Sequence, residues 1–169
     1  MMNMPPHHPM RRKDRFRDED FSLALIDRCT HGVVAIATDE PAPYCLPLSL
    51  VRVDRSLYFH GAKAGRKAEL LALHPQVCVT FVGEDCPAFQ PPYDYTTYFQ
   101  SVIATGTVHP VETPEEKAMA LRALCERMTP EAMDEAIFGH AITHDMVHTA
   151  IWRIDLEEIS GKEKPHPDK

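Results

Sequence analysis

The chain has 169 residues, of which 44% are hydrophobic and 25% are charged, which predicts one globular domain. Its formal net charge of -7 argues against a nucleic-acid-binding protein, because such proteins present a basic surface to the phosphate backbone. No apolar run approaches the roughly 18 residues that a membrane-spanning helix requires. With 15 prolines and only 7 glycines, the chain has few segments in which bare backbone could cradle a phosphate group.

Both ends of the chain are expected to be flexible extensions of a single domain. Residues 1–10 lack the apolar core of a secretory signal, so we expect a flexible lead-in and a cytoplasmic protein. Residues 11–162 form the expected domain, and residues 163–169 form an expected flexible tail. The five cysteines include no Cys-x-x-Cys pair, which is typical of reduced thiols in the cytoplasm.

The apolar pattern predicts a few helices in a chain made mostly of strands. Asp18 or Asp20 can cap a first helix, and a threonine cap at Thr113 followed by Pro114 starts a longer one that ends near 128. In chain order, strands are expected over 32–38, 44–54, 57–60, 77–83, 98–111 and 150–157, with short helices over 66–73 and 129–139. Residues 84–96 have no periodicity and are expected to form a long irregular loop.

Single residues refine these expected elements. Pro47 indicates an edge position or a bulge in its strand, because proline cannot donate to the sheet. Gly106 predicts a bend in its strand, and Gly139 predicts the end of the short helix that precedes the last strand. Six strands without regular strand–helix alternation predict a mainly β fold with peripheral helices, arranged as an antiparallel barrel.

The segment from Tyr58 to Lys67 carries the clearest chemical signal. A strand ends, a loop of small residues follows and a helix begins, and residues 60–67 include Lys63, Arg66 and Lys67 but no acidic residue. A helix start supplies free N–H donors and a partial positive charge, and the cations can add charge-assisted hydrogen bonds. The pattern therefore favours phosphate binding; the alternative from the residues alone is a solvated helix start that happens to be basic.

This segment resembles the flavin-phosphate segment of the pyridoxamine 5'-phosphate oxidase-like split barrels. The chain is most similar to their nitroimidazole-resistance (Nim-type) branch, over residues 10–162, through the order and spacing of several short motifs. These motifs are Met10-Arg11-Arg12-Lys13-Asp14-Arg15, Pro43-Tyr44-x-x-Pro47-Leu48, Tyr58-Phe59-His60-x-Ala62-x-x-Gly65-x-Lys67, Ser101-Val102-Ile103 with Gly106, and Ser160-Gly161-Lys162.

The resemblance implies a six-stranded split barrel that forms a homodimer, with one FMN in each of two clefts at the subunit interface. The implied cofactor-binding residues are Pro47, Leu48 and Ser49 beside the isoalloxazine ring, His60, Gly61 and Ala62 lining the cofactor, Arg66 and Lys67 on its phosphate, and Ser101 from the facing strand. The chain has Tyr98 and Phe99 where the Nim-type pattern has arginine and tyrosine, which bears on the substrate more than on the flavin.

His60 is the catalytic residue that the resemblance implies, because an imidazole near the flavin can exchange a proton near neutral pH. The alternative is a buried histidine at a strand end that hydrogen-bonds the backbone. The implied function is an FMN-dependent oxidoreductase that passes electrons from an external donor such as NAD(P)H to a small acceptor, for example a nitroaromatic. A non-catalytic flavin- or haem-binding module, or a cleft for a deazaflavin, is the alternative function.

Three histidines near the C-terminal end raise the question of a metal site. His140, His144 and His148 fall at intervals of four, which on one helix would align them as metal ligands. We expect no metal site, because His148 shares the alternation of the last predicted strand.

Overall fold

The computed structural model describes residues 10–145 and 148–167. The described strands are β1 (Phe16–Arg17), β2 (Gly32–Ile36), β3 (Tyr44–Leu48), β4 (Val51–Val53), β5 (Ser56–Ala62), β6 (Gln76–Gln90), β7 (Asp94–Pro110) and β8 (Thr149–Lys164). The described helices are α1 (Glu19–Arg28), α2 (Arg66–Leu73), α3 (Pro114–Met128) and α4 (Glu135–Asp145), with 3-10 turns over Lys13–Arg15 and Pro130–Ala132.

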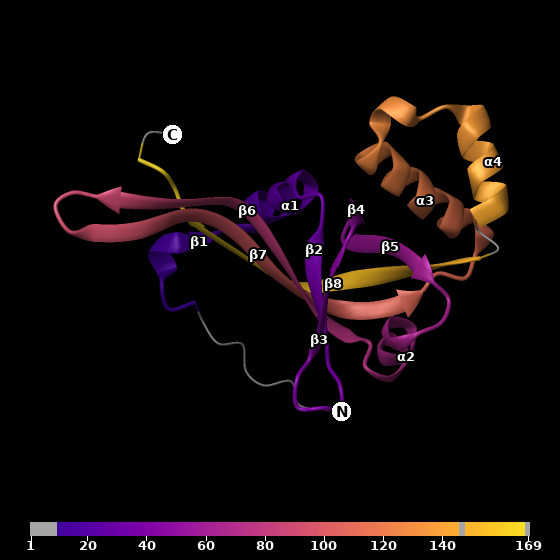
Figure 1. The fold of residues 1–169 in the computed structure, drawn as a ribbon, viewed down its shortest axis with the longest axis horizontal. Helices are drawn as coiled ribbons and strands as arrows, with labels where there is room; N and C mark the ends of the chain where they lie inside the picture. The colour runs from indigo at the N-terminus through magenta and orange to yellow at the C-terminus, as the bar shows by residue number, and fades with distance from the viewer. Residues whose placement is uncertain (1–9, 146–147, 168–169) are drawn as a thin grey trace.

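All strands belong to one antiparallel sheet with the order β3-β2-β6-β7-β8-β5-β4, and β1 pairs with β8 beside this path (Figure 1). The two ends of this order, β3 and β4, follow each other in the chain and are separated by Ser49 and Leu50 alone. So short a connection spans about 10 Å at most, so the two sheet edges lie near each other. The sheet is therefore curled into a split barrel, which confirms the predicted mainly β fold class.

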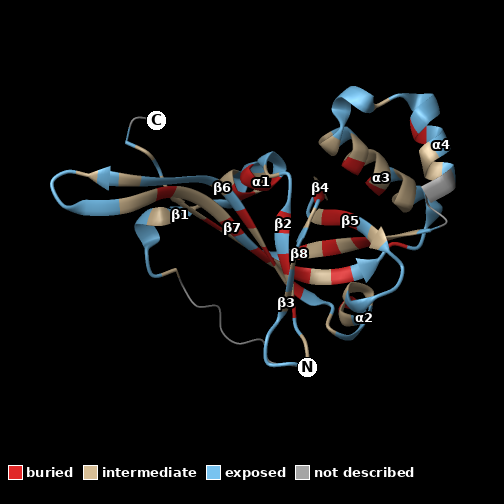
Figure 2. Cartoon of the chain, in the orientation of Figure 1, coloured by how far each residue is buried: buried red, intermediate tan, exposed pale blue. Residues whose placement is uncertain are grey.

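The core fills the inside of this barrel. Alternate residues of the central strands point inward, as the red bands on β2, β5, β7 and β8 indicate (Figure 2). The most deeply buried side chains of this core are Phe59, Phe81, Leu25, Ile36, Leu57, Ile154, Val34, Val79 and Val102. A smaller apolar cluster under α3, on the other face of β5 and β8, includes Tyr58, Ile151, Ala120 and Leu124.

The two helix caps predicted from the sequence are confirmed. The Asp18 carboxylate accepts a hydrogen bond from the Phe21 amide at 2.9 Å, so α1 begins at Glu19. The Thr113 hydroxyl accepts one from the Glu116 amide at 3.4 Å, with Pro114 in the first turn of α3. Gly106 lies at a register shift between β7 and β8, where an added Cβ would lie 2.3 Å from the Asp155 carbonyl oxygen.

The described residues form eight strands where six were predicted, and the expected strand over 44–54 is two strands. β3 forms the edge beside β2, as Pro47 indicated, and β4 forms a hairpin with β5 on the opposite edge. The break at Ser49 and Leu50 is where the chain crosses from one sheet edge to the other. The apolar alternation continues through this crossing, so the sequence pattern predicted one uninterrupted strand.

The prediction of an irregular loop over 84–96 is wrong. β6 and β7 continue as a paired hairpin arm from Asp85↔Phe99 to Gln90↔Asp94, beyond a register shift after Val82. The arm extends away from the barrel (Figure 1), and most of its residues are exposed on both faces. Because neither face is buried against a core, the segment has no apolar alternation, and its order comes from cross-strand hydrogen bonds.

The predicted end of the short helix at Gly139 is also wrong. The segment is a 3-10 turn followed by α4, which runs through Gly139 and contains His140 and His144. The helix starts where the Asp134 carboxylate accepts hydrogen bonds from the Ala136 and Ile137 amides. His148 lies in the turn before β8, and β8 extends to Lys164, beyond the expected domain end at 162.

The expected lead-in over 1–10 lies outside the described residues except for Met10. Among the residues that the structure describes, no helix is both long and apolar enough to cross a membrane.

Candidate functional site

The loop between β5 and α2 delivers the N-terminus of a helix to the surface. Gly65 precedes α2 with a φ of 105°, a backbone conformation that favours glycine, and a Cβ there would have no atom within 4 Å. No side chain of the described residues caps this helix start. The first N–H groups of α2 therefore have no side-chain acceptor. The open space beside Gly65 leaves room for an acceptor group of a ligand.

Lys67 places a cation beside this helix start. Its Nζ lies 5.0 Å from the centroid of the Trp152 ring and 5.5 Å from that of Phe59, and the two rings stack at 5.2 Å. A Cβ on Gly61 would lie 2.3 Å from this Nζ, so the missing side chain of Gly61 makes room for the ammonium group. Burial lowers the pKa of Lys67, and within the described residues no carboxylate pairs with it.

Arg66 connects the same helix start to the β2–β3 turn. Its guanidinium lies 3.1 Å from the Glu40 carboxylate, and it stacks 4.8 Å from the centroid of the Tyr44 ring on β3. Both members of this ion pair are more than half exposed, so the pair is weak and open to exchange with another anion.

β3 brings the predicted ring-binding residues to the same side of the molecule. Pro47 and Ser49 are exposed, whereas Leu48 is half-buried against the core. Within the described residues β3 pairs with β2 alone, so its outer edge presents unpaired backbone groups. Because Tyr44 lies under Arg66, the segment from Pro47 to Ser49 begins about 10 Å along β3 from the start of α2.

His60 and Lys67 lie on opposite faces of β5. Phe59 and Gly61 face the barrel interior and Lys67, whereas His60 shares the other face with Tyr58 and is exposed. The interpretation of His60 as a buried strand-end histidine is therefore wrong. Ala62 ends the strand and is exposed.

Ser101 is not brought to Lys67 within one chain. It pairs with Lys162 on β8, ten residues beyond Trp152, which is roughly 30 Å along an extended strand. Ser101 instead lies on the sheet face that points away from the barrel interior. This outer face consists of Pro47 on β3, Val33 on β2, Thr80 and Val82 on β6, and Ser101 and Ile103 on β7.

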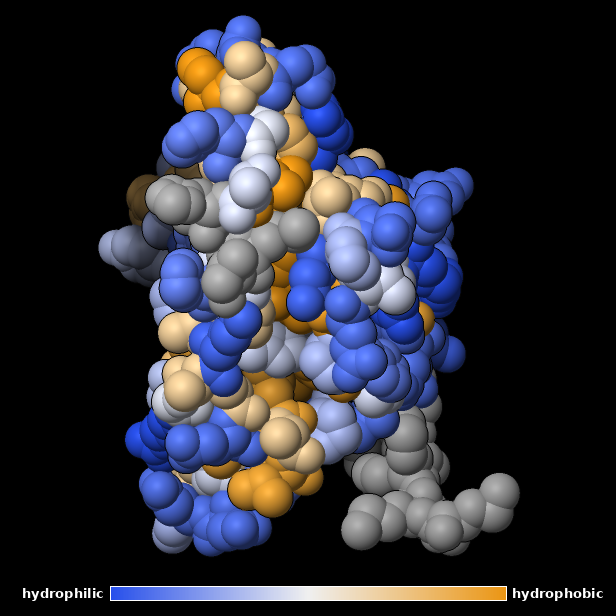
Figure 3. Space-filling model, turned by 90° about the vertical axis from the view of Figure 1, so that its right-hand side faces the viewer, coloured by the Kyte–Doolittle hydropathy of each residue, from blue (hydrophilic) through white to orange (hydrophobic). Residues whose placement is uncertain are grey.

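The side of the molecule that carries the end of β5 has a hollow between two projecting parts. In Figure 3 the α3–α4 lobe projects at the top and the α2 region projects below, with hydrophobic atoms in the hollow between them. His60 to Lys67 connect the strand and the helix that border this hollow. A ligand at the start of α2 would therefore lie next to apolar surface as well as to cations.

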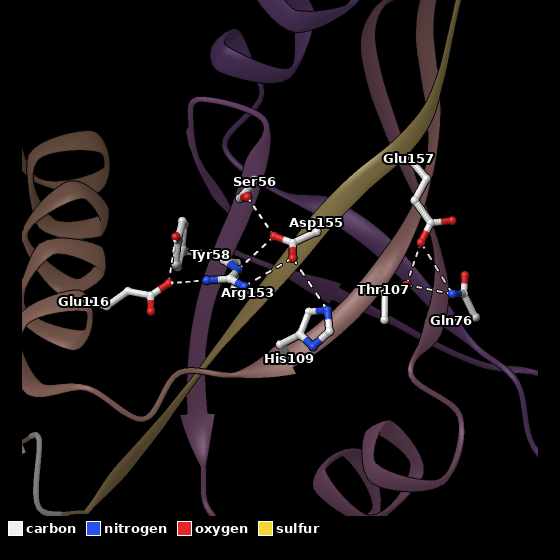
Figure 4. Close-up of polar contacts among 9 residues, drawn as sticks. All are labelled: Ser56, Tyr58, Gln76, Thr107, His109, Glu116, Arg153, Asp155 and Glu157. Atoms are coloured by element: carbon white, nitrogen blue, oxygen red, sulfur yellow. Dashed lines mark hydrogen bonds and ion pairs between the residues drawn. The ribbon is translucent and has the colours of Figure 1, made fainter.

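Sequence reasoning missed a polar network that fastens α3 to the sheet (Figure 4). The Glu116 carboxylate accepts hydrogen bonds from the Tyr58 hydroxyl at 3.0 Å and from Arg153 at 2.8 Å. Arg153 also pairs with Asp155, which accepts a hydrogen bond from Ser56 at 2.9 Å and lies 3.5 Å from His109. Its members come from α3, β5, β7 and β8, so the one local signal was Glu116 in the first turn of a predicted helix.

The network sets the charge states of its members. The hydrogen bonds to Glu116 and Asp155 raise the pKa of Arg153, so the guanidinium stays charged. Burial alone would raise the pKa of Asp155, but the hydrogen bonds from Ser56 and Arg153 outweigh burial and lower it below the usual 3.8. Because Arg153 pairs with Glu116 and Asp155 at once, the network indicates a structural connection and not a proton-transfer site.

A sequence profile of the pyridoxamine 5'-phosphate oxidase family matches residues 18–163. The chain belongs to this family. Solved structures of other proteins agree with the fold. One of them, from Bacteroides thetaiotaomicron, is named as a 5-nitroimidazole antibiotic resistance protein and is 23% identical to this chain. The two structures superpose with a TM-score of 0.73, and the match covers 92% of this chain and 95% of the other.

Two further structures show the same fold. The flavocytochrome Anf3 from Azotobacter vinelandii is 22% identical, with a TM-score of 0.75, over 95% of this chain and 74% of that one. An FAD-binding protein from Mesorhizobium loti is 20% identical, with a TM-score of 0.64, over 89% of this chain and 97% of that one. Among curated proteins none matches the sequence.

Proposed function

We propose that this member of the family binds FMN and uses it as an oxidoreductase, passing electrons from an external donor such as NAD(P)H to a small acceptor such as a nitroaromatic. The observation that carries the proposal is Lys67, a half-buried ammonium group without a carboxylate partner in the described chain, beside an uncapped helix start. A phosphate monoester supplies the anion that this arrangement lacks.

The remaining residues fit around a flavin anchored in this way. Arg66 would exchange its exposed Glu40 partner for the phosphate. The missing side chain of Gly61 makes room for the Lys67 ammonium group that would bind the same phosphate. The edge of β3 from Pro47 to Ser49 offers exposed backbone groups that can hydrogen-bond the rim of a flat ring system. By the family resemblance, His60 would lie near the reacting face of the flavin, where its exposed imidazole would hold or release a proton.

The flavin would supply the redox chemistry, and the protein would bind and orient it. The described part of the chain is accounted for by the split barrel and the α3–α4 lobe, so a nicotinamide donor would have to dock at the same cleft.

The outer face supports the expected homodimer. Val33, Val82 and Ile103 lie on this face with 41%, 60% and 51% of their surface exposed, across three neighbouring strands. A face of this kind matches a second copy of itself about a two-fold axis. In such a pair Ser101 of one chain would approach the flavin held by the other, which accounts for its separation from Lys67 within one chain.

The proposal predicts that FMN binding depends on Lys67. The freshly purified protein is expected to show flavin absorption, or to take up FMN with quenching of flavin fluorescence. Lys67→Ala should weaken FMN binding at least 10-fold, because a charge-assisted hydrogen bond contributes about 1.5–3 kcal/mol. The matched control, Lys13→Ala, removes an exposed lysine near the N-terminus and should leave the affinity unchanged.

Anaerobic mixing of the FMN-loaded protein with NADH or NADPH tests the redox role. Bleaching of the flavin band, and its return on adding a nitroaromatic, are the expected results. A flavin that stays oxidised would favour the alternative of a non-catalytic binding module. A protein that takes up haem or a deazaflavin but not FMN would contradict the choice of cofactor.

A further inference from the structure

The outer face of the sheet continues onto the β6–β7 arm. Side chains alternate along β7, so every second residue from Ile103 back to Tyr95 points to the same side. Their cross-strand partners on β6 share that side, and this continuation, here called the arm face, consists of Asp85, Pro87, Phe89, Tyr95, Thr97 and Phe99. Phe89 and Tyr95 have 51% and 82% of their surface exposed, and their ring centroids lie 4.9 Å apart.

A hollow of about 700 Å³ lies along the arm face. Its lining includes Arg15 together with Phe89, Tyr95, Thr97 and Phe99. The Arg15 guanidinium lies 5.7 Å from the centroid of the Phe99 ring. Aromatic side chains and arginine are enriched in protein–protein interfaces, so the arm face has the composition of a docking surface.

The opposite face of the arm is occupied by its own chain. Tyr98 is buried there against the C-terminal segment: its ring centroid lies 4.6 Å from that of His166 and 5.1 Å from the Lys164 Nζ. Gln90 donates a hydrogen bond to the Tyr98 hydroxyl, and Lys164 donates one to Thr96. The arm is therefore held on one side, and the arm face is the side that is left exposed.

The arm has the length needed to reach the cofactor end of a second copy, meaning the end of the sheet where Trp152 contacts Lys67. Tyr95 lies eight residues before Ile103 on β7, about 27 Å along an extended strand. Pro110 lies seven residues beyond Ile103, about 24 Å, and pairs with Trp152. Ile103 is therefore midway between the arm and the cofactor end.

A two-fold axis that crosses the strands near Ile103 would use this match. Such an axis reverses the strand direction between the two copies, so each arm would lie over the cofactor end of the other copy. The arm and α2 lie at opposite ends of the long axis of the molecule, as this arrangement requires (Figure 1). An axis along the strands would instead pair arm with arm and leave Ser101 opposite its own copy, away from the other flavin.

We propose that in the homodimer the arm face of each subunit covers the cofactor end of the other subunit and forms a wall of its flavin site. The inference rests on the proposed flavin site and on the proposed homodimer. The aromatic side chains of the arm exclude water from the Lys67 ammonium group and from the anion that it binds. This gives a binding role in the other subunit to a segment that extends away from its own barrel.

Thr97→Glu tests the effect of the arm on the cofactor. Thr97 lies six residues before Ile103, so its counterpart in the other copy is near His109, beside Pro110. The variant keeps the Phe89–Tyr95 ring contact but adds a negative charge near the phosphate. FMN affinity, measured by fluorescence quenching, should fall about 5- to 10-fold. The control Tyr93→Glu adds the same charge in the turn of the arm, at a side chain 88% exposed, and should leave the affinity unchanged.

Mixed dimers identify which subunit the arm serves. Thr97→Glu and Lys67→Ala should each weaken FMN binding, but a dimer with one subunit of each kind has one unaltered site, which combines Lys67 of the first subunit with the arm of the second. Subunit exchange between the two variants should therefore create tight FMN sites that neither parent has. Mixed dimers detected by native mass spectrometry that bind FMN no more tightly than the parents would overturn the proposal.

Photocrosslinking tests the contact without any flavin. Tyr95→p-benzoylphenylalanine should crosslink to residues 58–67 or 108–111 of the other copy, as identified by peptide mass spectrometry of dimers between isotopically distinct copies. Crosslinks confined to one chain, or joining the two arms, would overturn the arrangement even where FMN binds. The expected crosslinks in a protein that takes up no FMN would instead overturn the proposed function.

Discussion

Lys67 makes two opposing contributions to the stability of the folded protein. Cation–π contacts of its ammonium group with the rings of Trp152 and Phe59 stabilise the fold by about 0.5–2 kcal/mol. The ammonium group loses hydration by partial burial, and the lowered pKa records that loss. In the ligand-free protein no described carboxylate offsets it, so we infer that this residue is maintained for binding and not for stability.

This balance predicts that Lys67→Met stabilises the ligand-free protein at neutral pH. The folded pKa of Lys67 lies below its usual 10.5, so between these two values the unfolded chain binds more protons than the folded one. Wild-type stability should therefore rise with pH in this window relative to the variant. Urea unfolding of both proteins from pH 7 toward 10.5 measures the difference between their free energies of unfolding, and this difference should become smaller as the pH rises. A difference that stays constant with pH would refute the explanation.

Among the elements, α3 depends on the sheet for its position. Its apolar face rests on Tyr58 and Ile151, and Glu116 connects it to Arg153. This network holds α3 against the same face of β5 that carries His60. The lobe therefore helps to determine the surroundings of His60, although it supplies no residue to the predicted flavin contacts.

Glu116→Gln tests this connection. It keeps the shape of the side chain but removes the charge that pairs with Arg153, and we expect the free energy of unfolding to fall by about 1–2 kcal/mol. Glu115→Gln is a matched control in the same helical turn, since both carboxylates interact with the helix dipole. Equal losses in the two variants, measured by urea unfolding, would assign the effect to the dipole and not to the network.

At the scale of the whole molecule, the curled sheet has a buried inner face and an outer face that α3 covers on β5 and β8 but that is exposed on β2, β6 and β7. The three exposed apolar side chains of the outer face lie on adjacent strands, and Pro47 and Ser101 border them. A second copy that covers this face would bring the two sets of predicted flavin contacts together. Dimerisation and cofactor binding are therefore expected to be coupled.

Ile103→Glu tests this coupling. A charge at the centre of the outer face should convert a dimer into a monomer, as measured by light scattering after gel filtration, and weaken FMN binding in parallel. Ile137→Glu on α4 places the same charge at a position that is 65% exposed and away from this face. Ile103→Glu that remains dimeric with unchanged FMN affinity would refute both the interface and its coupling to the cofactor.

Local features of the chain were predictable because they depend on neighbouring residues. A few consecutive residues were enough to predict each of these features: the helix caps at Asp18 and Thr113, the start of α2 after Gly65, and the alternation in β8. The fold class followed from the number and spacing of such segments. The order of the motifs along the chain also indicated the family.

Contacts across the sheet could not be predicted in this way. The β6–β7 arm depends on strand register between distant segments, and so does the Arg153 network. A register shift of one residue would send every side chain of a strand to the other face of the sheet. The sequence by itself determined the fold class and a basic segment suited to phosphate. The tertiary structure decided that Lys67 faces inward without a counter-ion while His60 faces outward, because a strand's pleat and its partners assign each side chain to a face.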